Sequence, residues 1–231
     1  MDNIFFTHPE HIIGNHLELV DQEAAHASKV LRFNVGDELY ASDGKGSLYK
    51  TKVSSISKKS VFADILETDQ EPEPKTKKVM VFGAIKKRDR LEFAVEKAVE
   101  LGAWEICVFN ADHSERSKIN EDRLQSIVIS AFKQSKRRWL PEVKYLSSLD
   151  DVFKQYQGYH SVMAHVEAEV QRPEPLKHEK NLLLVGPEGG FSDREIELAK
   201  DKGAHMISLG KNRLRAETAA LTMLSQYLFT E

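Results

Sequence analysis

The sequence predicts two domains, a small β-rich unit followed by an α/β domain with a largely parallel sheet. Three observations support this prediction. The first seventy residues alternate short apolar runs with glycine-rich turns, the stretch 69–78 is polar and contains two prolines, and the remainder alternates apolar strands with amphipathic helices. We place the boundary after residue 70, which gives domains of residues 1–70 and 71–231.

One helix and three strands are expected in the first domain. Asp21 is a good N-cap residue, and Ala24, Ser28 and Leu31 after it keep helical spacing, so a helix is expected from Asp21 to about Phe33. The strands expected after it span residues 37–42, 47–56 and 60–67. With turn residues between them, these strands predict a small β-barrel.

The second domain is expected to alternate strands with helices. Its strands are the apolar runs at residues 79–85, 104–109, 160–165, 181–185 and 205–209. Its helices are expected from Asp89 to Gly102, from about Asn120 to Lys136, from Ser192 to Gly203, and through the last residues of the chain. Ser192 and Glu195 have the spacing of a capping box. Such alternation is typical of an α/β fold with a parallel sheet.

Composition limits the class of protein. The chain has 231 residues, of which 41% are hydrophobic and 30% charged, and its formal net charge is −3. A slightly negative net charge differs from the overall excess of basic residues found in many nucleic-acid-binding proteins. The single cysteine, Cys107, excludes an intrachain disulfide and a CxxC metal site. No segment approaches the roughly 18 apolar residues of a membrane span, so we expect a cytoplasmic protein with neither membrane contact nor metal.

Two glycine-rich loops follow predicted strands of the second domain. Residues 182–185 lead into Gly186-Pro187-Glu188-Gly189-Gly190-Phe191-Ser192, and the strand ending at Leu209 leads into Gly210-Lys211-Asn212-Arg213-Leu214-Arg215-Ala216-Glu217. Glycine lets the backbone approach a ligand closely, and parallel strands can bring such loops to one sheet edge. The spacing is neither that of a P-loop nor GxGxxG. The residues alone therefore indicate either a ligand cradle of another kind or tight turns without a ligand.

The two loops closely resemble the RsmE-type ribosomal RNA methyltransferases of the SPOUT superfamily. Further blocks similar to that family are His26-Ala27-Ser28-Lys29-Val30-Leu31-Arg32, Lys97-Ala98-Val99-Glu100-Leu101-Gly102, Ser114-Glu115-Arg116-Ser117 and Gln134-Ser135-Lys136-Arg137-Arg138. All these blocks occur in the family's order, and together they cover nearly the whole chain. One departure is Ala216, which stands where the family usually has threonine.

This resemblance implies a PUA-like β-barrel RNA-binding domain followed by a SPOUT methyltransferase domain whose C-terminal segment forms a trefoil knot. It implies S-adenosylmethionine as the cofactor and N3 of a uridine in 16S rRNA of the small ribosomal subunit as the methylated atom. The residues that it places around the cofactor are Ala164, His165, Gly186, Pro187, Glu188, Gly189, Gly190, Leu209, Gly210, Leu214 and Glu217. A homodimer is also expected, because knotted domains of this superfamily pair and the last helix is unusually apolar.

Methylation of uracil N3 removes a proton, so the site needs a proton acceptor as well as positioning groups. Glu217, Glu188 and His165 are the candidates for this acceptor. By analogy with the family, Arg215 stabilises charge on the uracil carbonyl oxygens or binds a phosphate. The expected catalytic residues are therefore Arg215 and Glu217.

Local charge favours an RNA partner. Residues 77–144 contain 15 Lys and Arg against 10 Asp and Glu. The expected RNA-binding residues are Arg32, Lys86, Lys87, Arg88, Arg116, Gln134, Arg137 and Arg138. Basic residues also occur at helix ends simply because they favour the helix dipole. Two other functions stay open, namely a SPOUT methyltransferase that acts on tRNA and a non-catalytic RNA-binding PUA-type protein.

Overall fold

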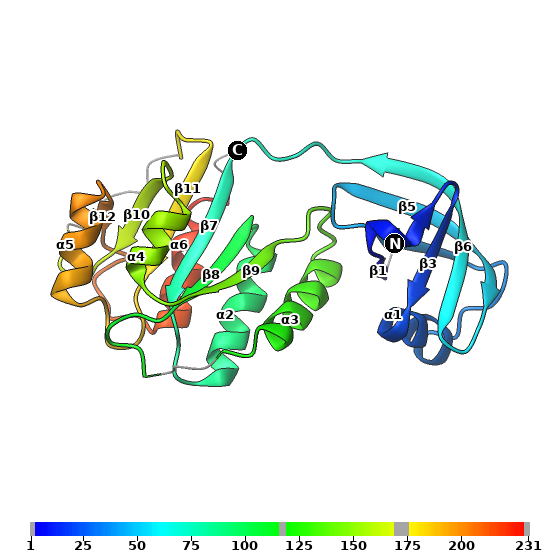
Figure 1. Ribbon diagram of the computed structural model, residues 1–231, viewed down its shortest axis with the longest axis horizontal. Coiled ribbons are helices and arrows are strands. Elements are labelled where there is room, and N and C mark those ends of the chain that lie inside the picture. The colour runs from blue at the N-terminus through cyan, green and yellow to red at the C-terminus, as the bar shows by residue number, and fades with distance from the viewer. Residues whose placement is uncertain (1–2, 116–118, 169–175, 229–231) are drawn as a thin grey trace. The chain divides into compact units, whose positions relative to one another are not determined.

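A computed structural model describes residues 3–115, 119–168 and 176–228 (Figure 1). Its contacts divide the chain into two compact units. The first comprises Met1–Glu73 together with Phe132–Leu140, and the second comprises Pro74–Ala131 together with Pro141–Glu231. Each unit has a hydrophobic core of its own.

The first unit is built on a six-stranded sheet. Its elements are β1 (Ile4–Phe6), η1 (Pro9–His11), β2 (Ile12–Ile13), β3 (His16–Val20), α1 (Asp21–Ala25), η2 (His26–Val30), β4 (Glu38–Ser42), β5 (Ser47–Ile56) and β6 (Ser60–Gln70). The strands pair in the order β1-β4-β5-β6-β3-β2, with β1 parallel to β4 and the other pairs antiparallel. Alternate residues such as Leu39, Val53 and Val61 point into the core. Among the described residues, β1 and β2 remain sheet edges, so the ladders of the expected barrel do not close into a ring.

The helix of the first unit is shorter and less regular than expected. α1 continues into the π-helical turn η2 and ends at Val30 rather than near Phe33. The N-cap position is taken by Val20, and Asp21 is instead the first helical residue, where its carboxylate still favours the helix dipole. After the π turn, Arg32 has a left-handed φ of 57°, which few residues other than glycine adopt.

A segment from later in the chain completes the first unit. Residues 135–140 follow the end of α3 (Glu121–Gln134) and pair with the turn before β5. The amide of Gly46 donates to the carbonyl of Arg138 over 2.9 Å, and the amide of Leu140 donates to the carbonyl of Gly44 over 3.1 Å. The chain thus passes between units after residues 73, 131 and 140, whereas the sequence predicts a single boundary after residue 70.

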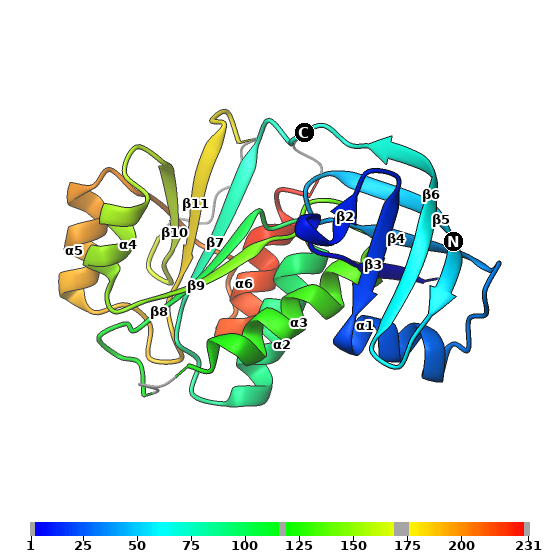
Figure 2. The ribbon, with the colours of Figure 1, turned by 45° about the vertical axis from the view of Figure 1, so that its right-hand side comes forward.

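The second unit is a six-stranded, wholly parallel sheet with helices on both faces (Figure 2). Its remaining elements are β7 (Lys77–Gly83), α2 (Arg88–Glu100), β8 (Glu105–Phe109), β9 (Glu142–Leu146), α4 (Leu149–Gln155), β10 (His160–Ala164), β11 (Lys180–Val185), α5 (Asp193–Asp201), β12 (His205–Ile207) and α6 (Ala216–Ser225). The strand order is β12-β10-β11-β7-β8-β9. The predicted α/β fold with a parallel sheet is confirmed.

The two faces of this sheet are covered by different helices. α4 and α5 share a core with the strands through Leu149, Phe153 and Ala199, while α6 lies along β7 and β11 beside α2. The sequence patterns do not predict β9 or α4. β9 is a half-exposed edge strand without a continuous apolar run, and α4 is short, although Ser148 caps it by accepting the amide of Asp151 over 3.2 Å.

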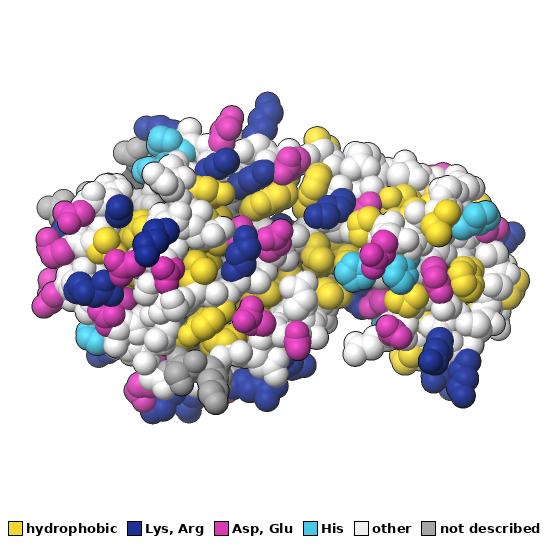
Figure 3. Space-filling view, viewed as in Figure 1, with side chains coloured by type: hydrophobic (Ala, Val, Ile, Leu, Met, Phe, Trp, Pro, Cys, Tyr) yellow, Lys and Arg dark blue, Asp and Glu magenta, His cyan; other side chains and the backbone are white. Residues whose placement is uncertain are grey.

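The surface carries charges of both signs. On the face seen in Figure 3, Lys and Arg side chains are interspersed with Asp and Glu. Within residues 3–115, 119–168 and 176–228, no helix is long and apolar enough to cross a lipid bilayer. The same part of the chain has no group of three or more His, Cys, Asp or Glu side chains placed to hold a metal ion.

Candidate cofactor pocket and RNA-contacting residues

A cavity of about 720 Å³ lies at the carboxyl edge of the parallel sheet in the second unit. Three segments line it, namely residues 164–166 at the end of β10, residues 185–191 after β11 and residues 208–216 after β12, together with Ala219 of α6. This is the sheet edge at which α/β folds bind ligands, and the volume is within the range of small-molecule sites. All the predicted cofactor residues except Glu217 line this cavity.

Glycine permits the compact shape of the loop after β11. The amide of Gly190 donates to the carbonyl of Pro187 over 2.9 Å, and Gly190 has a φ of 75°. The end of β7 lies directly against this turn, because a Cβ built on Gly83 would be 2.5 Å from Cδ of Pro187. A side chain at Gly83 would therefore displace one wall of the cavity.

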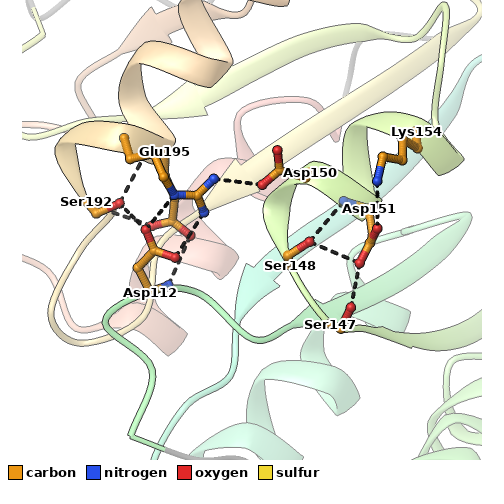
Figure 4. Close-up of polar contacts among 9 residues, drawn as sticks. Asp112, Ser147, Ser148, Asp150, Asp151, Lys154, Ser192 and Glu195 are labelled. Atoms are coloured by element: carbon orange, nitrogen blue, oxygen red, sulfur yellow. Dashed lines mark hydrogen bonds and ion pairs between the residues drawn. The ribbon is translucent and has the colours of Figure 1, made fainter.

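A polar network holds the far end of the same loop (Figure 4). Ser192 caps α5, and the buried carboxylate of Glu195 accepts the amides of Ser192 over 2.9 Å and of Asp112 over 3.1 Å. Arg194 donates twice to Asp112, over 3.0 and 2.9 Å, and once to Asp150 over 2.7 Å. The hydrogen bond from Arg194, followed by that from Ser192, lowers the pKa of Asp112. The network ties the loops after β8 and β11 together.

The carboxylate of Glu188 is held by the loop after β7. The backbone amide of Lys86 donates to both of its oxygens, over 3.1 and 3.3 Å. The ammonium of Lys86 forms an ion pair with Glu115, whose hydrogen bond raises the pKa of Lys86. Gly189 is equally confined, because a Cβ there would lie 2.9 Å from Cβ of His113. Contacts from two neighbouring loops thus fix the position of the loop after β11.

The segment after β12 forms the opposite wall. Gly210 has a φ of 127°, which side-chain-bearing residues rarely adopt. Leu214 is half-buried, whereas Lys211, Arg213 and Arg215 on either side of it are exposed. Arg215 occupies the N-cap position of α6 in an extended conformation. This wall therefore combines an apolar side chain with an exposed row of cations.

Glu217 lies outside the cavity lining. It is 8% exposed in the first turn of α6, and its Oε1 is 3.5 Å from Nε of Arg90 on α2. Its Oε2 has no hydrogen-bond partner in the described part of the chain. α6 packs against α2, so Glu217 faces that helix interface, where it can position the start of α6 but does not line the predicted pocket.

Three of the predicted RNA-binding cations form ion pairs within the chain. Lys86 pairs as described above, Arg88 donates to Glu92 over 2.6 Å, and Arg138 pairs with Asp69 over 2.6 Å. Arg138 thereby ties residues 132–140 to the end of β6. A paired cation is less available to a phosphate, because binding there must displace a carboxylate.

The other predicted RNA-binding residues differ from one another. Arg137 is half-buried, and burial lowers its pKa to about 10. Arg32, Lys87 and Gln134 are exposed. Arg116 lies outside the described residues.

Sequence reasoning missed several groups at this site. It did not assign Lys211 or Arg213 a role, although two cations at alternate positions next to a glycine loop were a visible signal. It also missed the contact of Asp112 with Arg194, which joins residues 82 positions apart and has no local pattern to reveal it.

Comparison with known proteins places this arrangement in a family. The family model described as an RNA methyltransferase domain matches residues 72–228, and the RNA methyltransferase PUA domain matches residues 19–66. The chain belongs to this RNA methyltransferase family. The ribosomal RNA small subunit methyltransferase E of Rickettsia conorii is 32% identical, covering 91% of this chain and 88% of the relative, and that of Bacillus subtilis is 28% identical, covering 90% and 87%.

Solved structures of methyltransferases agree with this assignment. The ribosomal RNA small subunit methyltransferase E from Neisseria gonorrhoeae, bound to S-adenosyl methionine, superposes with a TM-score of 0.84 at 26% identity, covering 97% of this chain and 96% of that one. A methyltransferase from Legionella pneumophila, in complex with the same cofactor, gives a TM-score of 0.85 at 28% identity, covering 96% and 95%. The resemblance drawn from the sequence blocks is confirmed.

Proposed function

We propose that the chain is an S-adenosylmethionine-dependent methyltransferase that methylates N3 of a uridine in 16S rRNA of the small ribosomal subunit. The observation that carries this proposal is the glycine-lined cavity at the carboxyl edge of the parallel sheet in a member of this family. The names of its relatives specify the small-subunit ribosomal RNA as their substrate, and two similar structures hold S-adenosylmethionine.

The cavity suits this cofactor. Side chains built on Gly190 and Gly210 would meet nothing within 4 Å, so the space beside these backbones is open to a ligand. Backbone groups of Gly186 and Gly190 would hold the polar parts of the cofactor, and Leu209 and Leu214 offer apolar surface to the adenine ring. When bound, the cofactor supplies a methyl group on a sulfonium, which is a good leaving group, so no metal is required.

The residues of the chain must position the uracil and manage its proton. Uracil N3 loses its proton as it gains the methyl group, and that proton needs an acceptor. Of the three candidates, His165 and Glu188 line the cavity, whereas Glu217 is better described as a positioning residue for α6. Arg215 lies on the cavity wall as an exposed cation and would stabilise negative charge on the uracil carbonyl oxygens.

The division of labour between domains is also part of the proposal. Residues 1–70 would act as the PUA-like RNA-binding domain and residues 71–231 as the methyltransferase domain, in line with the two family matches. Exposed Arg32, Lys87 and Gln134 would contact the RNA. We expect an assembled small subunit in the cytoplasm as the substrate, because a PUA-like domain reads shape and backbone more than sequence.

The oligomeric state is proposed to be a homodimer formed through the knotted domain. Ala220, Met223 and Leu224 of α6 are buried within their own unit, whereas Leu221 is half-buried and Leu228 is 36% exposed. Burial of the Leu221 and Leu228 side chains against a second copy of the chain would remove apolar surface from water and so stabilise a dimer. Light scattering at micromolar concentration tests this, and a stable monomer would contradict it.

The C-terminal segment is proposed to be threaded as a trefoil knot. The support is the path of the chain. β12 pairs with β10 at one edge of the sheet, and residues 208–215 then lead the chain back toward the middle of the sheet, where α6 packs against β7 and β11. Threading predicts slower refolding when a bulky domain is fused to the C-terminus than when it is fused to the N-terminus. Equal refolding rates for the two fusions would argue against the knot.

The function is tested with a mixture of small subunits and total tRNA from cells that lack this protein. The purified chain and S-adenosylmethionine carrying a labelled methyl group are added, and the product is located by a reverse-transcription stop, since N3 methylation blocks base pairing. We expect one new stop in 16S rRNA. Label found only in tRNA would favour the tRNA enzyme, and RNA binding without any transfer would favour the non-catalytic protein.

A further inference from the structure

One wall of the cofactor cavity carries positive charge that no described residue pairs with. Lys211, Arg213 and Arg215 are exposed, and their side chains make no ion pair or hydrogen bond with any residue that the structure describes. Residues 208–216 contain no Asp or Glu. These cations therefore differ from Arg138, whose charge is already paired with Asp69.

The other described residues of the cavity lining do not neutralise these three cations. The segments 164–166 and 185–191 contribute a single carboxylate, that of Glu188, to its lining. Both oxygens of that carboxylate accept the backbone amide of Lys86. The cavity thus has a largely uncharged glycine wall and a cationic wall.

This asymmetry conflicts with the charge of the cofactor. S-adenosylmethionine has a sulfonium, an ammonium and a carboxylate, so it carries one net positive charge. Unpaired cations beside it disfavour its binding, and solvent only weakens the repulsion. An anion placed over the cationic wall would remove this penalty.

We propose that Lys211 and Arg213 bind backbone phosphates of the RNA beside the target base, and that this contact couples RNA binding to cofactor binding. The inference rests on the proposed function. Phosphates over the cationic wall cancel its repulsion of the cofactor, so each ligand tightens the binding of the other by the same factor. S-adenosylhomocysteine has no net charge, so its binding is expected to depend little on the RNA.

Calorimetry of the whole protein tests the coupling. The affinities for S-adenosylmethionine and for S-adenosylhomocysteine are measured with and without single-stranded oligouridylate. For the unaltered chain we expect oligouridylate to tighten S-adenosylmethionine binding by about two- to fivefold. The affinity for S-adenosylhomocysteine should change by less than about twofold. In the Lys211→Gln, Arg213→Gln double variant this gain should vanish, and S-adenosylmethionine binding without RNA should be about two- to fivefold tighter than in the unaltered chain, because the repulsion is already absent.

A matched control separates this wall from general surface charge. Lys202 is an equally exposed cation that follows α5 and precedes β12, at the opposite edge of the sheet. Lys202→Gln should keep the full coupling. Equal coupling in the double variant and the control would overturn the proposal, as would an S-adenosylmethionine affinity that oligouridylate leaves unchanged. Failure of the unaltered chain to bind S-adenosylmethionine at all would instead count against the proposed function.

Discussion

Residues 136–139 and residues 211–215 are both short basic segments beside a helix end, yet their cations have different partners. In the first, Arg138 pairs with Asp69 and lies 3.9 Å from Glu71, so it joins residues 132–140 to the sheet of the first unit. In the second, Lys211 and Arg213 are exposed beside the cofactor cavity. A basic run in a sequence therefore gives the number of charges but not the number available to a ligand.

The glycines beside these two basic segments also differ in what surrounds them. Gly46 has a φ of 97°, and a Cβ there would lie 2.7 Å from the carbonyl oxygen of Glu71 and 2.8 Å from the ring of Trp139. Gly210 also has a positive φ, but it lines the cavity, and a Cβ there would meet nothing within 4 Å. We infer that the first glycine serves packing and the second serves the ligand.

The largest expected effect on stability is that of Gly46→Ala. The new methyl group must displace Trp139 or the backbone at Glu71, and the left-handed conformation adds strain, so we expect a loss of about 2 to 4 kcal/mol in unfolding free energy. Urea denaturation measures this loss. Gly14→Ala is the control, because Gly14 has a positive φ but open space around it. Its loss should be about 1 kcal/mol, and equal losses would refute the packing role.

Gly210→Ala should act on the ligand instead. Its φ of 127° is unfavourable for alanine, so residues 209–215 are expected to shift and S-adenosylmethionine affinity to fall about tenfold. Calorimetry gives the affinity. Gly203→Ala introduces a milder left-handed strain outside the cavity, at a φ of 75°, and should leave the affinity within about twofold. Similar affinities for the two variants would show that the conformation of Gly210 does not matter to the site.

A smaller effect is expected when low pH removes the stabilisation that the ion pair of Arg138 with Asp69 contributes. The hydrogen bond from Arg138 lowers the pKa of Asp69 below its ordinary value of 3.8. The pKa of Asp69 is lower in the folded than in the unfolded state. The pair therefore contributes its full stabilisation above the ordinary pKa of 3.8, and this stabilisation is lost as pH falls through the folded-state pKa. Arg138→Gln should therefore lower the urea midpoint at pH 7 and lower it less at about pH 3. Arg213→Gln should show no such pH-dependent difference, and a matching one would contradict the contrast.

The sequence could predict what depends on local pattern. β11, β12, the capping box of Ser192 with Glu195, and the glycine loops all have signatures within a few residues, although β12 ends at Ile207 rather than at the predicted Leu209. Most of the residues predicted for the cofactor site line the cavity. Contacts between distant segments have no such signature. For this reason the sequence does not reveal that Glu217 contacts Arg90 or that Arg138 pairs with Asp69.

The salt dependence of RNA binding tests most directly whether the cations of residues 211–215, rather than the paired Arg138, face the phosphates. Affinity for single-stranded oligouridylate is measured across a range of salt for the unaltered chain, Arg213→Gln and Arg138→Gln. Each phosphate contact on a single strand contributes about 0.7 to the slope of log affinity against log salt. We predict that Arg213→Gln reduces the slope by about 0.7 while Arg138→Gln leaves it unchanged. The reverse pattern, or an equal reduction in both variants, would contradict the account.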